Sequence, residues 1–272
     1  MSGRSKAKGR RSLPRKQDEA LLAIDVGNTQ TVLGVFAGEQ LISLWRMSSR
    51  LARTGDELSV LVESLCRTHL EEIRRSGRVV IGSVVPMLTQ EFEAMTHRLF
   101  EARPLIVTNE VRCGVQFDLP DPTSIGADRI ANAAAVAGGS LPAIVVDLGT
   151  ATTFDVVNGR GHYIGGAIAP GIRTSADELF RRAARLAKVE IRKPRRRIGR
   201  TTEESIQSGI FYSAVGTIDG IVRELEAELR CSARVIATGG LAPLVAPSSR
   251  VIQEVDEALT LRGFARIDSL NR

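Results

Sequence analysis

The chain has 272 residues, which is enough for two modest domains that each bury a core. Hydrophobic residues make up 43% and charged residues 25%, as in an ordinary globular protein. No apolar run reaches the roughly 18–20 residues that cross a bilayer, and no apolar segment follows the basic N-terminus as a secretory signal requires. We therefore expect a cytoplasmic protein with no membrane partner.

The net charge of +6 is concentrated at the N-terminus. Residues 1–20 hold seven Lys and Arg against Asp18 and Glu19, so this segment carries five of the six net charges. We interpret residues 1–20 as a disordered basic tail. Because a nucleic-acid binder usually has a basic face on its folded part, we expect no nucleic-acid partner. A second basic cluster spans residues 192–200, and we interpret it as a solvated loop, with attraction of an anionic ligand as the alternative.

Cysteine and histidine spacing indicates neither disulfides nor a metal site. The three cysteines are scattered, which fits a reducing compartment, and the three histidines lack ligand spacing: Cys66, Cys113, Cys231, His69, His97 and His162.

The first half of the chain predicts a sheet with helices. Apolar runs and turn residues predict strands at residues 21–25, 31–36, 40–45, 79–84 and 104–107. Helical apolar spacing predicts helices at 54–75, 89–100 and 128–137.

The pattern then restarts. Strands are predicted at 143–147, 153–158, 161–168 and 234–238, helices at 176–187 and 259–268, and one long or broken helix at 202–229. The restart predicts two duplicated domains, an N-terminal one at 21–138 and a C-terminal one at 139–272.

Two copies of one turn motif accompany the restart. Residues 25–31 read DVGNTQT and residues 147–153 read DLGTATT, each after an apolar strand and before a hairpin. A single D-x-G turn is weak support, because any hairpin can use Asp and Gly. In a pair, the glycines let backbone N–H groups approach an anion, and an Asp at a strand end can hold hydrated Mg²⁺. The pair therefore predicts two turns that grip a triphosphate.

A third strand, at residues 235–238, ends in Gly239 and Gly240. Alone it could be an ordinary strand-to-helix turn; beside the other two turns it is the expected place for adenosine. The sequence contains neither G-x-x-x-x-G-K-[ST] nor G-x-G-x-x-G, which argues against P-loop and Rossmann folds.

This three-part pattern resembles the acetate and sugar kinase, Hsp70 and actin superfamily, and within it the type III pantothenate kinases. The family's D-V-G-N-T-N-T stands here as residues 25–31 with Gln30 for the second Asn, and its G-A-D-R stands at 126–129. Its D-x-G-T-A-T-T matches 147–153 and its G-G-A-I-A-P-G-I matches 165–172. The resemblance runs from about residue 21 to 265 and implies an α/β fold of two duplicated ribonuclease H-like (actin-like ATPase) domains with a nucleotide cleft between them.

The resemblance also implies roles for single residues. Asp128 would be the catalytic base that accepts the substrate hydroxyl proton. Asp147 would bind a monovalent cation, K⁺ or NH₄⁺, and Asp25 is a candidate Mg²⁺ ligand. Pantothenate would contact Gly126, Ala127, Asp128, Arg129 and Thr202. ATP would contact Asp25, Val26, Gly27, Asn28, Thr29, Gln30, Thr31, Val32, Gly149 and Thr150. The family is dimeric, so a homodimer is expected.

Two positions depart from the family pattern. Leu119 stands where the family has a substrate-contacting Tyr, and Ile198-Gly199-Arg200-Thr201-Thr202 replaces I-G-K-N-T. The sequence thus predicts phosphorylation of pantothenate to 4′-phosphopantothenate, the first step toward coenzyme A. A kinase for another small hydroxy-acid and a non-catalytic regulatory or accessory relative are the alternatives.

Overall fold

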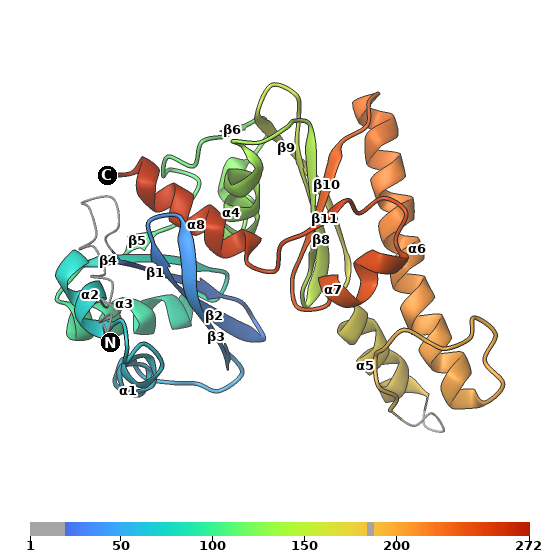
Figure 1. Ribbon diagram of the computed structural model, residues 1–272, viewed down its shortest axis with the longest axis horizontal. Helices are drawn as coiled ribbons and strands as arrows, with labels where there is room; N and C mark the ends of the chain where they lie inside the picture. The colour runs from blue at the N-terminus through green and yellow to red at the C-terminus, as the bar shows by residue number, and fades with distance from the viewer. Residues whose placement is uncertain (1–19, 184–187) are drawn as a thin grey trace, which may run out of the picture.

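The computed structural model describes residues 20–183 and 188–272. Two β-sheets stand beside each other, with helices α4 (Ala127–Val136) and α8 (Leu259–Leu270) between them (Figure 1). The predicted tail lies outside the described residues except for Ala20, which begins the first strand.

The first sheet has the strand order β3-β2-β1-β4-β5. β1, β2 and β3 form an antiparallel meander, and β4 and β5 continue the sheet in parallel with β1. The strands span Ala20–Val26 (β1), Gln30–Ala37 (β2), Gln40–Ser48 (β3), Arg78–Ser83 (β4) and Leu105–Ile106 (β5). Parallel neighbours need a crossover, which the helices after β3 and β4 provide.

The second sheet has the order β11-β10-β7-β8-β9-β6. β7, β8 and β9 are again an antiparallel meander, and β10 and β11 again continue in parallel. The strands span Gln116–Phe117 (β6), Ala143–Leu148 (β7), Ala151–Val157 (β8), His162–Pro170 (β9), Arg234–Thr238 (β10) and Glu254–Val255 (β11). Apart from the short edge strand β6, the two sheets share one topology, which confirms the predicted duplication of an actin-like α/β unit.

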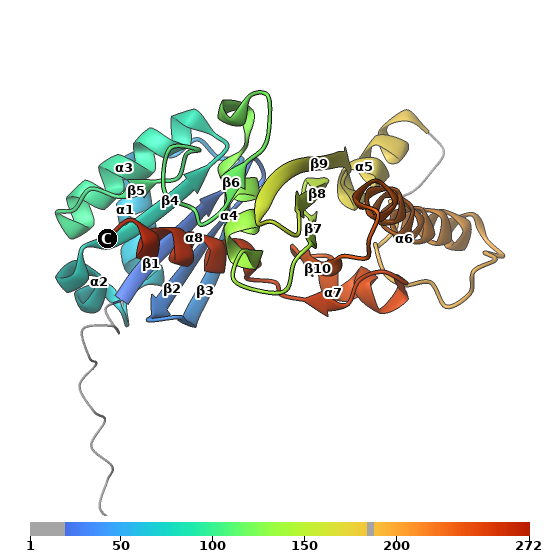
Figure 2. The same ribbon diagram turned by 90° about the horizontal axis from the view of Figure 1, so that it is seen from above.

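Helices cover both faces of the first sheet (Figure 2). β1 is an almost continuous apolar run because both of its faces are buried. Leu22 and Ile24 face α1 (Gly55–Leu65), α2 (Leu70–Ser76) and α3 (Pro86–Phe100), whereas Leu21 and Ala23 face α4 and α8. The C-terminal helix α8 therefore packs on the first sheet.

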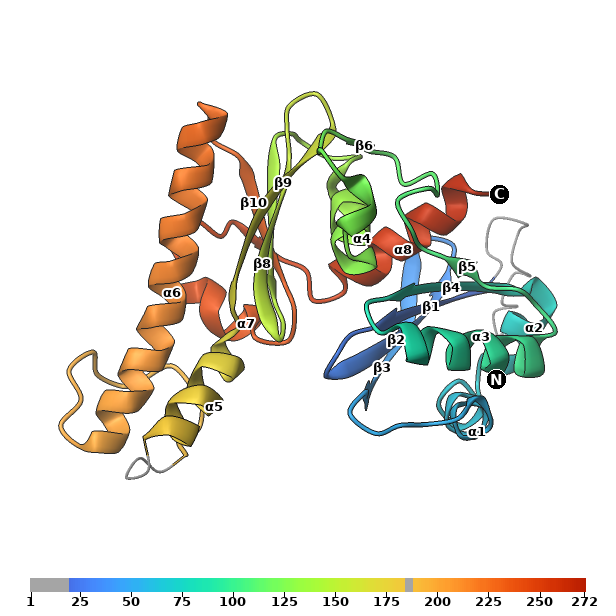
Figure 3. The ribbon, with the colours of Figure 1, turned by 180° about the vertical axis from the view of Figure 1, so that it is seen from behind.

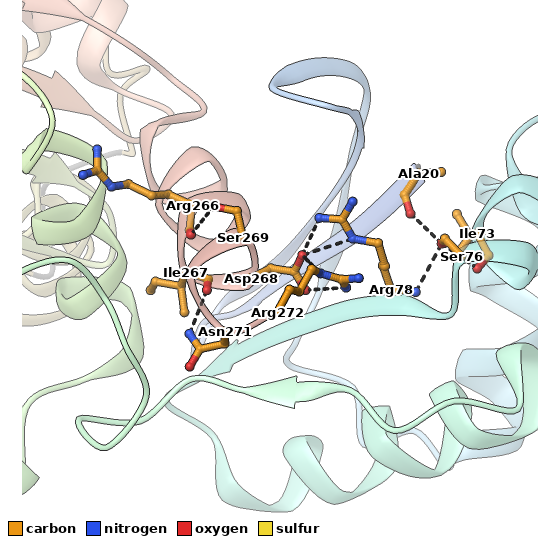
Figure 4. Close-up of polar contacts among 10 residues, drawn as sticks. All are labelled: Ala20, Ile73, Ser76, Arg78, Arg266, Ile267, Asp268, Ser269, Asn271 and Arg272. Carbon is orange, nitrogen blue, oxygen red and sulfur yellow. Dashed lines mark hydrogen bonds and ion pairs between the residues drawn. The ribbon is translucent and has the colours of Figure 1, made fainter. Parts of the chain in front are cut away.

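An ion-pair cluster holds the end of α8 to this sheet (Figure 4). Asp268 is only 3% exposed. Its carboxylate accepts hydrogen bonds from Arg78 Nη2 on β4 at 2.6 Å and from Arg272 Nε at 2.8 Å. The contact between Arg78 and Asp268 joins residues that are far apart in the sequence.

The outer face of the second sheet carries α5 (Ile172–Arg182), the long helix α6 (Thr202–Leu229) and α7 (Ala242–Val245) (Figure 3). Phe211, Ile218 and Val222 of α6 pack in a core with Ile144 and Phe154 of the sheet. Two short 3₁₀ turns, Pro122–Ser124 and Ala246–Ser248, complete the described elements. None of the described helices is long and apolar enough to cross a membrane.

Most predicted elements are present, and the differences have local causes. α6 and β10 have the predicted bounds. The single helix predicted at 54–75 is wrong, because Cys66 ends α1 and His69 N–H donates to Cys66 O, which makes a tight turn before α2. α5 begins at Ile172, after Gly171, rather than at residue 176, and the last part of the prediction, 184–187, lies outside the described residues.

Candidate active site

The first glycine turn joins β1 to β2 and begins with the partly exposed Asp25. Gly27 N–H donates to Gln30 O at 3.1 Å and closes the turn. Asn28 and Gln30 are exposed. Their side chains and the turn's backbone are therefore accessible to a ligand.

The second glycine turn repeats this construction between β7 and β8. Asp147 is partly exposed, and Gly149 and Thr150 are exposed. Gly149 N–H donates to Ala151 O at 3.0 Å. In both turns the residue two after the Asp thus makes the closing hydrogen bond.

A direct hydrogen bond joins the two turns. Thr150 Oγ1 donates to Thr29 Oγ1 at 2.9 Å, across a separation of 121 residues. The carbonyl oxygen of Thr150 accepts from Thr174 Oγ1 at 2.6 Å and from Gly171 N at 3.2 Å, so the second turn is fixed to the start of α5. The two motifs that the sequence separates therefore meet in the folded chain.

The third turn packs on the second. Gly239, after β10, has a φ of +88°, which disfavours any other residue. A Cβ at Gly239 would lie 2.7 Å from Asp147 Oδ1 and 2.8 Å from Leu148 O. Only glycine allows this approach, so the β10 turn borders the Asp147 carboxylate directly.

Asp128 lies in the first turn of α4, whose N-cap is Gly126. Its Oδ1 accepts from the backbone N–H of Arg129 at 2.9 Å. A Cβ at Gly126 would lie 2.5 Å from this same oxygen. A side chain at position 126 would therefore displace the Asp128 carboxylate.

The pKa values of the two turn aspartates, Asp25 and Asp147, are both raised. Burial, followed by the charges of Asp128 and Asp147, raises the pKa of Asp25 well above its ordinary value. Burial, followed by the charges of Asp128 and Asp155, raises the pKa of Asp147 to about 7, while a hydrogen bond from Asn132 works in the opposite direction. The site therefore has an excess of negative charge that a cation would relieve.

The guanidinium of Arg129 pairs with Asp155 of β8, through a contact of 2.6 Å from Nε to Oδ1. The Asp155 carboxylate also accepts hydrogen bonds from Asn132 and Tyr163, and the Tyr163 ring lies beside the guanidinium. The sequence reasoning assigned none of these three, although an Asp inside the apolar run 154–157 was the available signal.

The predicted residues do not all meet. Val26 and Thr31 are buried in the first sheet, and the Thr31 hydroxyl is hydrogen-bonded to Ser49 Oγ at 2.8 Å. Thr202 is exposed at the start of α6, on the outer side of the second sheet from α4 (Figure 3). Its predicted contact with substrate stays a prediction.

A cavity lies near the three carboxylates but outside their cluster. This cavity of about 220 Å³ between α5 and α6 is bordered by Thr152, on the opposite face of β8 from Asp155. Within residues 20–183 and 188–272, no group of three or more His, Cys, Asp or Glu side chains is arranged to hold a metal on its own.

Solved structures with a similar architecture define the class of protein. A Baf family protein from Campylobacter jejuni aligns with a TM-score of 0.56, at 18% identity, over 92% of this chain and 98% of that chain. The component A of (R)-2-hydroxyglutaryl-CoA dehydratase from Acidaminococcus fermentans aligns with a TM-score of 0.53, at 11% identity, over 92% and 96%. With the duplicated sheets and the joined turns, these likenesses define an actin-like ATPase fold.

Sequence comparison gives the family. The profile of the family "Type III pantothenate kinase" matches residues 21–224. A type III pantothenate kinase of Geobacter sulfurreducens is 47% identical over 258 residues, covering 93% of this chain and 99% of the relative. That of Myxococcus xanthus is 45% identical over 252 residues, covering 92% and 98%. The chain belongs to the type III pantothenate kinase family.

Proposed function

We propose that the protein transfers the γ-phosphoryl group of ATP to a hydroxyl group of pantothenate and so makes 4′-phosphopantothenate, the first step of coenzyme A biosynthesis. The observation that carries the proposal is the meeting of the two glycine turns beside the start of α4, with Asp25, Asp128 and Asp147 close enough to shift pKa values. Membership of the family supports pantothenate as the acceptor.

The two turns are proposed to hold the phosphates of ATP. Residues 25–32 of the first turn and Gly149 with Thr150 of the second supply backbone N–H groups and hydroxyls, which suit an anion. The bond between Thr29 and Thr150 would give way to phosphate oxygens. Since Val26 and Thr31 are buried, their proposed part is limited to their backbone or to shaping the turn.

Asp128 is proposed as the base at the acceptor hydroxyl. A carboxylate beside this hydroxyl orients the nucleophile and accepts its proton during phosphoryl transfer. Gly126 and Ala127 would border the same end of α4, and Arg129 would pair with the pantothenate carboxylate, for which a planar guanidinium is suited.

The site's oxygen ligands fit Mg²⁺ and a monovalent cation. Asp25 and Asp147 both have raised pKa values, caused by burial and by neighbouring carboxylates, and bound cations would relieve that repulsion. We propose Asp25 as a Mg²⁺ ligand and Asp147 as the ligand of K⁺ or NH₄⁺. When bound, these cations would neutralise charge on the transferring phosphoryl group.

A homodimer is proposed to complete the substrate site. α6, which begins at the exposed Thr202, and α4, which carries Asp128, lie on opposite sides of the second sheet (Figure 1), so we propose that a second copy of the chain makes the contact between Thr202 and pantothenate. Light scattering at micromolar concentration should give about twice 29.4 kDa. A monomer with full activity would contradict both the proposed homodimer and the proposed role of Thr202.

The test of the proposed function is ADP release by the purified protein in a coupled assay, with and without pantothenate. We expect ADP release that depends on pantothenate. We also propose that the protein acts in the cytoplasm, where ATP is available. ADP release with another small hydroxy-acid but not with pantothenate would favour a kinase that acts on that hydroxy-acid. Binding of ATP without any release would favour a non-catalytic accessory protein.

A further inference from the structure

We propose that Asp155 is a positioning residue for Arg129, which it fixes so that the free edge of the guanidinium meets the carboxylate of pantothenate. The inference rests on the proposed function, in which Arg129 binds that carboxylate. It adds a residue from the interior of β8 to a site otherwise built from turns and the start of α4.

Asp155 is held on both of its oxygens. It has no exposed surface, and its Oδ1 accepts from Arg129 Nε at 2.6 Å and from Tyr163 Oη at 3.1 Å. Its Oδ2 accepts from Asn132 Nδ2 at 3.2 Å. Because donors on both α4 and β9 converge on one carboxylate, its orientation is set by the fold and not by solvent.

The guanidinium of Arg129 is oriented in turn by this carboxylate. Asp155 occupies Nε, and Nη2 donates to Phe154 O at a longer 3.4 Å. The guanidinium carbon lies 5.8 Å from the centre of the Tyr163 ring, so the ring borders the planar group. The side chain of Arg129 is 19% exposed whereas that of Asp155 is 0% exposed. The buried Asp155 therefore holds the Arg129 guanidinium in place, while part of the guanidinium side chain remains accessible to solvent.

Asn132 connects this arrangement to the phosphate side of the site. It is fully buried on α4, and its Oδ1 accepts from Thr260 Oγ1 of α8 at 2.9 Å. The same amide that donates to Asp155 also lies close enough to Asp147 to lower the pKa of that carboxyl. The position of Arg129 is therefore coupled to the carboxylate of the second glycine turn, as a kinase needs if acceptor and phosphate are to be aligned.

Stability alone is a poor reason for such a network. A buried ion pair costs desolvation on both partners and is often no more stabilising than apolar residues of the same volume. A planar guanidinium held at Nε, by contrast, keeps Nη1 and the second N–H of Nη2 for an incoming carboxylate. The geometry suits recognition of an anionic group at a fixed place.

The test is the steady-state kinetics of Asp155→Asn, which keeps the shape and removes the charge. We expect the KM for pantothenate to rise roughly 10- to 100-fold, the range set by one charge-assisted hydrogen bond, with the KM for ATP nearly unchanged and kcat changed much less. Asp155→Asn should have little effect on the KM for pantothenyl alcohol, in which a hydroxymethyl group replaces the carboxylate. The preference for pantothenate over this alcohol should therefore fall by a similar factor.

A double-mutant cycle shows whether Asp155 acts through Arg129. In an Arg129→Gln background, Asp155→Asn should have no further effect on the KM for pantothenate, because the group that it positions is gone. The matched control is Asp219→Asn. Asp219 is another buried carboxylate, which accepts from Ser249 Oγ at 2.6 Å on the far side of the second sheet. Its loss should lower stability without changing the KM for pantothenate.

The possible failures are distinguishable. Wild-type protein with no pantothenate-dependent turnover would overturn the proposed function itself. If Arg129→Gln raised the KM but Asp155→Asn left both the KM and the preference unchanged, the function would stand and the positioning role would be wrong. If Asp155→Asn does not fold, Tyr163→Phe removes only the Oη donor, and it should raise the KM for pantothenate about threefold or more. An unchanged KM in that folded variant would equally overturn the inference.

Discussion

Asp147 should make the stability of the cation-free protein depend on pH near neutrality. Burial and the charges of Asp128 and Asp155 raise the pKa of its carboxyl from 3.8 to about 7 in the folded chain. In the unfolded chain the same group has its ordinary pKa. Between these two values the folded state holds a proton that the unfolded state has released.

The sign and size follow from linkage. Since the folded state binds the extra proton, its contribution to stability is full at pH values below 3.8 and is lost as the pH rises to about 7. The free energy of unfolding should fall by about 1.4 kcal/mol for each pH unit across this window, and then level off. The raised pKa values of Asp25 and Asp155 add slopes in the same direction.

The assay is the melting temperature by circular dichroism at pH 5, 6, 7 and 8, in a buffer whose only monovalent cation is tetramethylammonium. Asp147→Asn is the comparison, because it keeps the shape and cannot ionise. We expect the melting temperature of the variant, relative to that of the wild type, to rise by several degrees between pH 5 and pH 7 and by little between pH 7 and pH 8. A constant difference across the range would mean that Asp147 titrates at its ordinary pKa and that its surroundings are not as repulsive as the geometry indicates.

Three further predictions concern the reaction and the fold. Asp128→Asn should lower kcat roughly 100-fold or more with ATP affinity unchanged, as measured by turnover and by nucleotide titration; a variant that keeps more than about a tenth of the turnover would exclude the base. Turnover should be higher in K⁺ or NH₄⁺ than in Na⁺ and should require Mg²⁺, and equal rates in all three monovalent salts would remove the cation role of Asp147. Asp268→Asn removes the carboxylate that accepts from Arg78 and Arg272, and it should destabilise the fold by about 3 kcal/mol in thermal or urea unfolding while leaving the KM for pantothenate unchanged.

Local signals were sufficient for much of the fold. The long helix α6 has the predicted bounds because its N-cap Thr201 accepts from Glu204 N–H and its apolar positions continue without a break. The two glycine turns were identifiable because an apolar strand, an Asp and a Gly recur in the same order. Short elements were missed: β6 and β11 have two residues each and exist only because a neighbouring strand pairs with them.

Long-range packing was beyond what the sequence gives. The helix at the C-terminal end has ordinary amphipathic spacing, and nothing in that spacing indicates that it returns to the first sheet. The contact between Asp268 and Arg78 depends on the folded path of the chain (Figure 4). The proposed domain boundary at 138/139 was placed from the restart alone, and it assigns α8 to the second unit although its core partners, Leu21 and Val80, belong to the first sheet.

The same limit explains the pairing of Arg129. In the sequence, the nearest acid is Asp128, and a helix-start pair is the simple interpretation. In the folded chain the side chain extends toward the neighbouring sheet, and it meets Asp155 at 2.6 Å. An Asp between Phe154 and Val156 was a visible irregularity in a buried strand, yet its partner could be assigned only once α4 was placed against β8.

This pairing also decides which charges of the site remain for cations. Arg129 offsets the charge of Asp155, and the structure assigns no comparable partner to Asp25, Asp128 or Asp147 within the part of the chain that it describes. Three carboxylates at the meeting point of the two glycine turns, which we propose to bind phosphate, would repel the triphosphate of ATP if they stood alone. Backbone N–H groups in the turns contribute only partial charges, so in the proposed mode of ATP binding we expect the attraction to come from ions that enter with the nucleotide or bind at Asp147. The proposed requirement for cations therefore follows from the site's own charge balance, and we expect it to persist even if the acceptor were a different hydroxy-acid.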